Sequence, residues 1–249
     1  DFIKSAHAIA PALSQKGLSI GERVLAAIQA TQSVVNCNTN LGIVLLFAPL
    51  CFAVEQCKSF EELPVQLKKA LDNLTVQDAE NTYTAIRLAH AGGLGEVADQ
   101  DIKSTPTITL LQAMEQAKNR DLIAAQYCNN YNDIFQIGLQ KLTDQIICGE
   151  TVEWATTFAY LYLLSHYPDT LIARKQGEET ATKVSSKAQS FIDNVNNINK
   201  IDTFEAALNA WDNELKTNAI NPGTTADLVA SCLVLHSFQQ AFALNRISV

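Results

Sequence analysis

Four polar stretches interrupt a chain of apolar helical patterns, and each carries residues that could do chemistry. The most specific is NAINPGTTADL at 218–228. Pro222 cannot continue a helix and Gly223 permits unusual φ angles, so the turn can bring its backbone close to a ligand. Thr224 is a natural N-cap for the next helix, whose free N–H groups can hold phosphate. Asp227 would repel that phosphate unless a cation such as Mg²⁺ lies between them. A capped helix without a ligand is the alternative.

The second stretch, YPDTLIARKQG at 167–177, places two cations and a carboxylate close together. Arg174 and Lys175 side by side, with Asp169 nearby, suit a polyphosphate that carries its metal. The same pattern fits a solvated helix end with a surface ion pair.

The remaining two stretches are HAGGLGE at 90–96 and NCNTNLG at 36–42. His90 could act as an acid–base group or cap a helix end, and Glu96 could bind a metal. The small polar side chains of Asn38, Thr39 and Asn40 could contact a base or ribose, or satisfy the loop backbone.

The elements that position these residues are predicted to be helices. Apolar residues recur with helical period over most of the chain, for example at 20–35, 121–148 and 225–243. Ser19 with Glu22 and Ser59 with Glu62 each fit a capping box. No run alternates as a strand would. We therefore expect an all-α fold, a single compact domain over residues 1–249 with about ten helices.

Composition narrows the class of protein. The net charge of −8 over 249 residues argues against a nucleic-acid-coating surface. The longest apolar run, 41–54, is too short to span a bilayer and predicts a buried helix, so we expect no membrane partner. The six cysteines form no C-x-x-C pair and predict buried, reduced thiols of a cytoplasmic protein. The apolar faces of 225–243 allow a homodimer.

Together these stretches resemble the triphosphoribosyl-dephospho-CoA synthase family, across almost the whole chain and in matching order. NPGTTADL and the pattern D-x-x-x-x-R-x-x-G at 169–177 are the most specific parts. The matching segments are NTNLG at 38–42, TPTITLLQAM at 105–114, NRDLIAAQY at 119–127, PDTLIARKQG at 168–177 and NPGTTADLVA at 221–230.

This resemblance implies an all-helical enzyme that uses ATP with a divalent cation, Mg²⁺. Such an enzyme transfers a triphosphoribosyl group to the 2′-hydroxyl of dephospho-CoA and releases adenine. The implied phosphate and ribose contacts are Asn221, Gly223, Thr224 and Thr225, with Arg174 and Lys175 on the polyphosphate and Asn38, Thr39 and Asn40 on the opposite wall.

The resemblance also implies which residues take part in catalysis. Asp227 would hold Mg²⁺, and Asp169 would support either the Mg²⁺ ion or the side chains of Arg174 and Lys175. Glu96, Asp169 and Asp227 are the acids available to stabilise an oxocarbenium-like state. Either His90 or Glu96 would give a proton to the leaving adenine.

Two departures from the family pattern leave other functions open. Asn40 and Leu41 stand where the family usually has His and Lys, and the usual upstream Lys-Pro-Gly segment is missing, so the chain is expected to start after it. The chain is thus most similar to the divergent branch of archaea and methylotrophic bacteria. The alternatives are a different nucleotide-dependent transfer in one-carbon cofactor biosynthesis, of the methanopterin or methanofuran type, and a non-catalytic nucleotide-binding helical protein.

Overall fold

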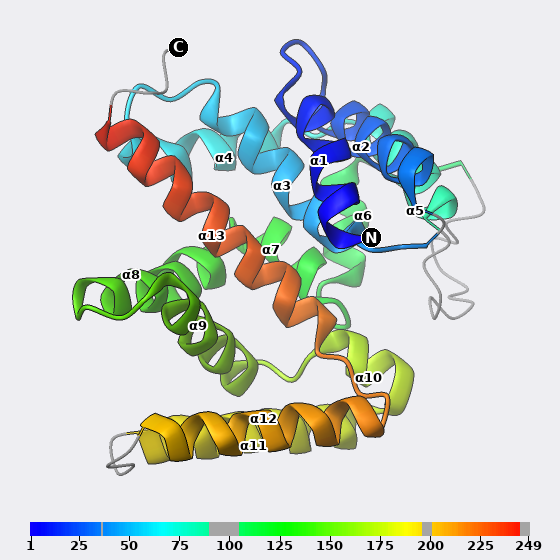
Figure 1. Cartoon of the computed structure of the whole chain (residues 1–249). Helices are drawn as coiled ribbons and strands as arrows, with labels where there is room; N and C mark the ends of the chain where they lie inside the picture. Colours follow the sequence, from blue (N-terminus) through cyan, green and yellow to red (C-terminus); the bar gives the residue numbers. More distant parts are fainter. Residues whose placement is uncertain (36, 90–104, 196–200, 245–249) are drawn as a thin grey trace. The chain divides into compact units, whose positions relative to one another are not determined.

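The computed structural model describes residues 1–35, 37–89, 105–195 and 201–244, and this part of the chain contains helices and no strands (Figure 1). The all-α prediction is confirmed. The described residues form thirteen α-helices, so the predicted number was too low. The difference arises because turns divide the long periodic stretches.

The clearest case is the stretch 121–148, which the sequence predicts as one helical run. The chain enters the left-handed region at Asn130 (φ 58°) and Tyr131 (φ 60°), which ends the first helix. A π-helical turn, Ile134–Leu139, then leads into the next helix. Positive φ is unfavourable for a side chain as large as tyrosine, so burial of Tyr131 must stabilise this turn.

The chain divides into two compact units: residues 1–132 with the part from 233 on, and residues 133–232. The single domain expected over residues 1–249 stays a prediction. The first unit contains α1 Phe2–Ser14, α2 Ile20–Val34, α3 Leu41–Val54, a short 3₁₀ turn Phe60–Glu62, α4 Leu63–Asp72, α5 Val76–Leu88, α6 Leu110–Ala117 and α7 Leu122–Asn129. The second contains α8 Gln140–Ile147, α9 Val152–His166, α10 Thr170–Gln176, α11 Glu178–Val195 and α12 Ile201–Thr217; α13, Gly223–Ala243, contributes to both.

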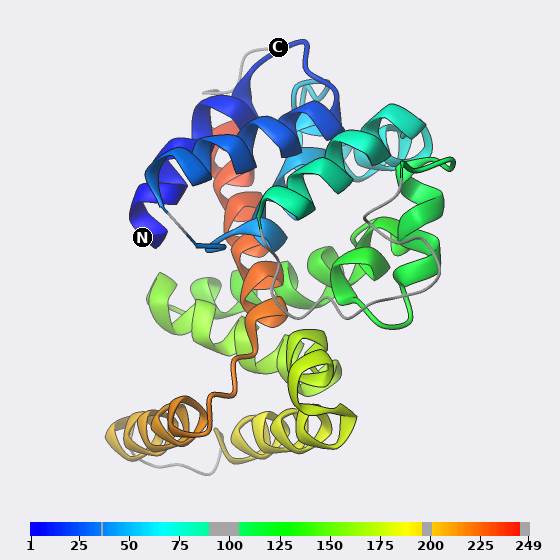
Figure 2. The same ribbon diagram turned by 90° about the vertical axis from the view of Figure 1, so that its right-hand side faces the viewer.

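In the first unit, α2 and α5 lie side by side (Figure 2). They meet at Gly21 and Asp78. A Cβ atom on Gly21 would lie 2.5 Å from the Asp78 Cα, so the crossing requires glycine. The buried Asp78 carboxylate joins the starts of both helices. It accepts hydrogen bonds from Gly21 N (2.8 Å), Ser19 Oγ (2.7 Å), Thr75 N (2.9 Å) and Thr75 Oγ1 (2.6 Å).

The Asp78 carboxylate should make the stability of the folded protein depend on pH. Burial alone would raise the pKa of Asp78, but the hydrogen bonds from Thr75, Gly21 and Ser19 outweigh it and lower the pKa. A pKa that is lower in the folded state contributes stability above the unfolded pKa of about 3.9, and this contribution is lost as pH falls through the folded pKa. Urea unfolding should show Asp78→Asn less stable than the parent by about 2 kcal/mol at pH 7, with a smaller gap at pH 3.

The apolar run 41–54 forms α3, whose centre is buried as predicted. Pro49 lies inside this helix and has no N–H for the carbonyl of Leu45 four residues earlier. The hydroxyl of the fully buried Tyr127 donates to the Leu45 carbonyl at 2.7 Å, and the Tyr131 hydroxyl donates to the next carbonyl, Leu46, at 3.2 Å. Two tyrosines thus satisfy the carbonyls around the proline.

We therefore expect Tyr127→Phe to destabilise the protein although it removes only one oxygen atom. The buried Leu45 carbonyl would lose its partner, at a cost of about 1–3 kcal/mol. Thermal and urea unfolding of Tyr127→Phe measure this. If its stability equals that of the parent, the Tyr127 hydroxyl is not needed to satisfy the Leu45 carbonyl that Pro49 leaves without a backbone donor.

Cysteine burial was only partly predicted. All six cysteines are free, which fits reduced thiols. Cys57 and Cys232 are buried, but Cys37 and Cys148 are exposed, so the prediction of burial is wrong for these two. Within the described residues, no helix has the length and apolar character needed to cross a membrane.

The second unit has a core rich in aromatic side chains from α9, α11 and α12. Phe191 of α11 contacts two rings of α12, Phe204 edge-on at 5.9 Å and Trp211 at 5.2 Å between ring centroids. Phe204 also lies against Trp154 (6.3 Å) and Phe158 (6.1 Å) of α9. These ring contacts fix α12 against α9 and α11.

Candidate functional site

The two most specific sequence motifs pack along each other in the second unit. Helix α10, from PDTLIARKQG, runs beside the segment 218–225, from NAINPGTT. The contacts in order along α10 are Asp169 with Thr225, Thr170 with Thr224, Leu171 with Gly223, and Gln176 with the carbonyls of Asn218 and Ala219. The turn is therefore held at both of its ends by one short helix.

Asp169 makes the strongest of these contacts. Its side chain is fully buried, and each carboxylate oxygen accepts two hydrogen bonds. Oδ1 caps α10 by accepting from Leu171 N (2.8 Å) and Ile172 N (3.1 Å). Oδ2 accepts from Thr225 N (2.7 Å) and Thr225 Oγ1 (2.8 Å). One carboxylate thus joins the first turns of α10 and α13.

This arrangement favours a positioning role for Asp169. Burial raises the pKa of this carboxyl, and the hydrogen bonds from Thr225, Ile172 and Leu171 offset only part of that effect. A metal ion would have to compete with four donors for the same oxygens. The predicted catalytic and metal-binding roles of Asp169 stay predictions.

The start of α13 differs slightly from the prediction. The helix begins at Gly223, so Thr224 lies in its first turn and is not the N-cap. Thr224 and Thr225 are both buried, whereas Asn221 is exposed and Asp227 is half-buried. The hydroxyl of Thr225 is occupied by Asp169 and that of Thr224 accepts from Thr170 at 3.3 Å. Among the predicted site residues of this motif, Asn221 and Asp227 have side chains that are not buried.

The turn before Asn221 is held by several hydrogen bonds. Ile220 N donates to Leu215 O at 2.8 Å and Ala219 N donates to Lys216 O at 3.1 Å, which closes the end of α12 in a Schellman motif. Ala219 takes the left-handed position, with φ 53°, where glycine is usual. Gln176 Nε2 donates to the Ala219 carbonyl at 2.9 Å and helps to hold this conformation.

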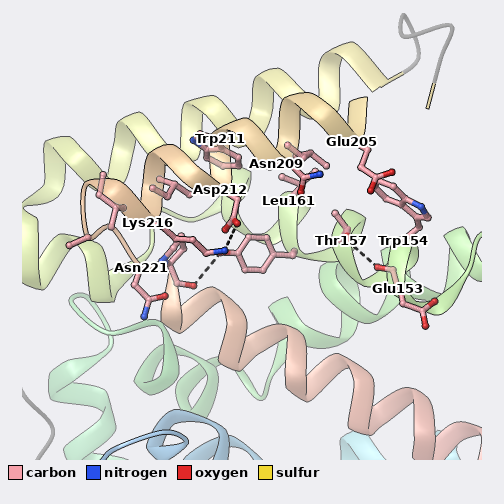
Figure 3. A pocket seen from close by; sticks show the side chains of 16 residues that line it. Glu153, Trp154, Thr157, Leu161, Glu205, Asn209, Trp211, Asp212, Lys216 and Asn221 are labelled. Carbon is pink, nitrogen blue, oxygen red and sulfur yellow. Dashed lines mark hydrogen bonds and ion pairs between the residues drawn. The ribbon is translucent and has the colours of Figure 1, made fainter. Parts of the chain in front are cut away.

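A pocket of about 820 Å³ opens beside this turn (Figure 3). Residues of α9 and α12 face each other across it, and Asn221 and Pro222 line it next to the motif. The Tyr160 hydroxyl reaches the Pro222 carbonyl at 3.5 Å. The lining consists of Glu153, Trp154, Thr157, Tyr160, Leu161, Glu205, Leu208, Asn209, Trp211, Asp212, Leu215, Lys216, Ala219, Ile220, Asn221 and Pro222.

The charges around this pocket are mainly acidic. Glu153, Glu205 and Asp212 contribute three carboxylates, and Lys216 contributes one ammonium, which forms an ion pair with Asp212. In Figure 3, Lys216 and Asn221 lie toward one end of the pocket and Glu153 and Trp154 toward the other. Within the described residues, no three His, Cys, Asp or Glu side chains form a group that could hold a metal ion.

The other predicted wall, Asn38–Asn40, belongs to the first unit and precedes α3. Asn38 Oδ1 accepts from Leu41 N at 3.1 Å, and Thr39 Oγ1 donates to Ser5 Oγ at 2.9 Å. Asn40 is buried and its amide donates to Thr31 Oγ1 at 3.0 Å. All three side chains have a partner in the local fold, and their contact with a nucleotide stays a prediction.

The remaining predicted residues fall into two groups. Arg174 and Lys175 lie exposed in the last turn of α10, the helix that runs along the motif turn. His90 and Glu96 lie outside the described residues, and their proposed part in proton transfer stays a prediction.

Sequence reasoning missed the pocket because its walls follow ordinary helical patterns. Trp154 and Leu161 on α9, and Leu208, Trp211 and Leu215 on α12, recur at core-like spacing. One signal was present: the chain has two tryptophans, and both line the pocket.

The chain matches a known protein family and is similar to a solved structure. The family model CitG, ATP:dephospho-CoA triphosphoribosyl transferase, matches residues 1–246. A crystal structure of an Archaeoglobus fulgidus protein, provisionally described as a triphosphoribosyl-dephospho-CoA synthase, is similar with a TM-score of 0.74 and 25% sequence identity, over 96% of this chain and 97% of that chain. No curated protein matches the chain.

Proposed function

The chain belongs to the ATP:dephospho-CoA triphosphoribosyl transferase family, and on this premise we propose that it transfers the triphosphoribosyl group of ATP to dephospho-CoA at the NPGTTAD turn. One observation supports the placement: α10 and the turn 218–225, the two most specific motifs, contact each other at both ends of α10.

The reaction requires few groups from the protein. A hydroxyl oxygen of the acceptor attacks C1′ of the ATP ribose, the C1′–N9 bond breaks, and adenine leaves with a proton. Positive charge develops on the ribose, so a nearby carboxylate stabilises the transition state. Asp227 is half-buried, lies just after the first turn of α13 and is the acid of the motif. We assign it this role, while Asp169 keeps the two helix starts in place.

The triphosphate is expected to meet cations and backbone donors. Arg174 and Lys175 are exposed in the last turn of α10, the helix beside the turn. Mg²⁺ is usually held by one or two carboxylates together with substrate phosphates, which suits a site that offers Asp227 and no cluster of three acids among the described residues. Bound there with ATP, Mg²⁺ would neutralise part of the charge on the phosphates.

Adenine release tests this proposal. The protein is incubated with ATP, Mg²⁺ and dephospho-CoA, and the products are separated by chromatography and weighed by mass spectrometry. We expect free adenine in equal amount to a product that carries the triphosphoribosyl group. Formation of ADP or AMP without adenine would instead support the alternative of another nucleotide-dependent transfer. Binding of ATP without turnover on any acceptor would support a non-catalytic protein.

A further inference from the structure

The acidic pocket between α9 and α12 has no role in the proposed triphosphate site, yet it adjoins the NPGTTAD turn through Asn221 and Pro222. Three carboxylates against a single, already paired ammonium make it a poor place for phosphates. Its floor contains aromatic and aliphatic side chains, so it suits an uncharged ligand that carries hydrogen-bond donors.

The shape of the pocket narrows the ligand further. Its lining extends from Glu153 to Leu161 along α9 and from Glu205 to Lys216 along α12. At 1.5 Å per residue, these stretches are about 12 and 16 Å long. A purine base alone would leave most of this length unfilled, so an extended chain fits better than a flat ring.

We propose that this pocket binds the pantetheine arm of the acceptor, an inference that rests on the proposed function. The arm is uncharged and long, and its two amide N–H groups and hydroxyl are donors for carboxylates such as Glu205 and for the Asn209 amide. Its branched methyl groups can pack against Trp211 and Leu208. The end of the arm that joins the diphosphate would lie at Asn221, where the pocket meets the NPGTTAD turn, so that the diphosphate itself stays outside the pocket. The thiol would lie toward Trp154 (Figure 3).

The intrinsic tryptophan fluorescence of the protein can report binding at this site. Both tryptophans of the chain, Trp154 and Trp211, line the pocket. Pantetheine alone, added without ATP, should therefore change the tryptophan fluorescence in a saturable way. In the turnover assay it should compete with dephospho-CoA and not with ATP.

A matched pair of variants locates the effect. Asn209→Phe places a ring in the pocket, whereas Asn213→Phe makes the same change one turn later on α12, at an exposed residue outside the lining. We expect Asn209→Phe to weaken pantetheine binding and raise the KM for dephospho-CoA by at least about fivefold, equivalent to roughly 1 kcal/mol. The KM for ATP should stay unchanged, and Asn213→Phe should behave like the parent.

The outcomes separate this inference from the proposed function. Dephospho-CoA-dependent adenine release with no fluorescence response to pantetheine, or with the same KM in both variants, overturns the pantetheine site and leaves the reaction intact. Saturable pantetheine binding lost in Asn209→Phe supports the pocket even if adenine is not released, in which case the proposed reaction is wrong.

Discussion

Replacing Asp169 with asparagine should lower the free energy of unfolding by about 3 kcal/mol and weaken ATP binding at the same time. The reason is geometric. An amide nitrogen in place of one oxygen would face Thr225 N or the N–H groups of Leu171 and Ile172, which are themselves donors. A buried donor would lose its partner, and the first turns of α10 and α13 would separate. Urea unfolding and calorimetric titration with ATP measure the two effects.

Two control variants make this test specific. Thr225→Val removes the hydroxyl donor to Asp169 and keeps the backbone donor, so it should cost only about 1 kcal/mol. Asp193→Asn makes the same exchange at an exposed residue and should leave stability and ATP binding unchanged. If Asp169→Asn were as stable as Asp193→Asn, the carboxylate would not join the two helices.

The pH dependence of Asp169 should be opposite to that of Asp78. Burial raises the pKa of Asp169, so the folded chain binds this proton more readily than the unfolded chain. Stability from Asp169 therefore increases as pH falls through its folded pKa, down to the unfolded value of about 3.9. On acidification, the gap between parent and Asp169→Asn should widen, while the gap for Asp78→Asn narrows.

The second large effect is expected at Gly21, where replacement by alanine should lower the free energy of unfolding by about 3 kcal/mol. The new Cβ would lie 2.5 Å from the Asp78 Cα and 2.7 Å from its carbonyl oxygen, both backbone atoms that no rotamer change can move. Helices α2 and α5 would have to separate, and Asp78 would lose its bond from Gly21 N. Thermal unfolding and the exchange protection of the α2 amides measure this.

Gly223→Ala is the matched control for this change. It also adds a methyl group in the first turn of a helix, but its nearest obstacle is the Leu171 Cδ2 atom at 2.7 Å, the end of a flexible side chain. Leu171 can turn away, so we expect a loss below about 1.5 kcal/mol. Equal losses in both variants would mean that the α2–α5 crossing is not limited by backbone contact.

The sequence predicted the helical class and the motif residues better than their geometry. The capping box at Ser19 and Glu22 is formed as predicted, because both partners lie within one turn. At Ser59 the predicted box is absent: the next turn is 3₁₀, and the Glu62 carboxylate accepts from Lys58 N instead. Such a local pattern does not specify which type of turn follows.

Contacts between distant segments were beyond sequence reasoning. Asp169 and Thr225 are 56 residues apart, and nothing in either motif indicates that one carboxylate caps both helices. The pocket could not be predicted for the same reason, since its walls come from α9 and α12, whose sequences separately predict helices and no cavity. The motifs indicated where chemistry is concentrated, and only the packing shows that α10 and the turn form one structure.

The most direct test of a nucleotide site at the NPGTTAD turn is calorimetric titration of the protein with ATP in the presence of Mg²⁺, compared with Asp227→Ala and with Asp193→Ala as an exposed control. Our account predicts micromolar affinity for the parent, about −8 kcal/mol, a loss of tenfold or more for Asp227→Ala, and no change for Asp193→Ala. Equal ATP affinity in the parent and Asp227→Ala would contradict a nucleotide site at this turn.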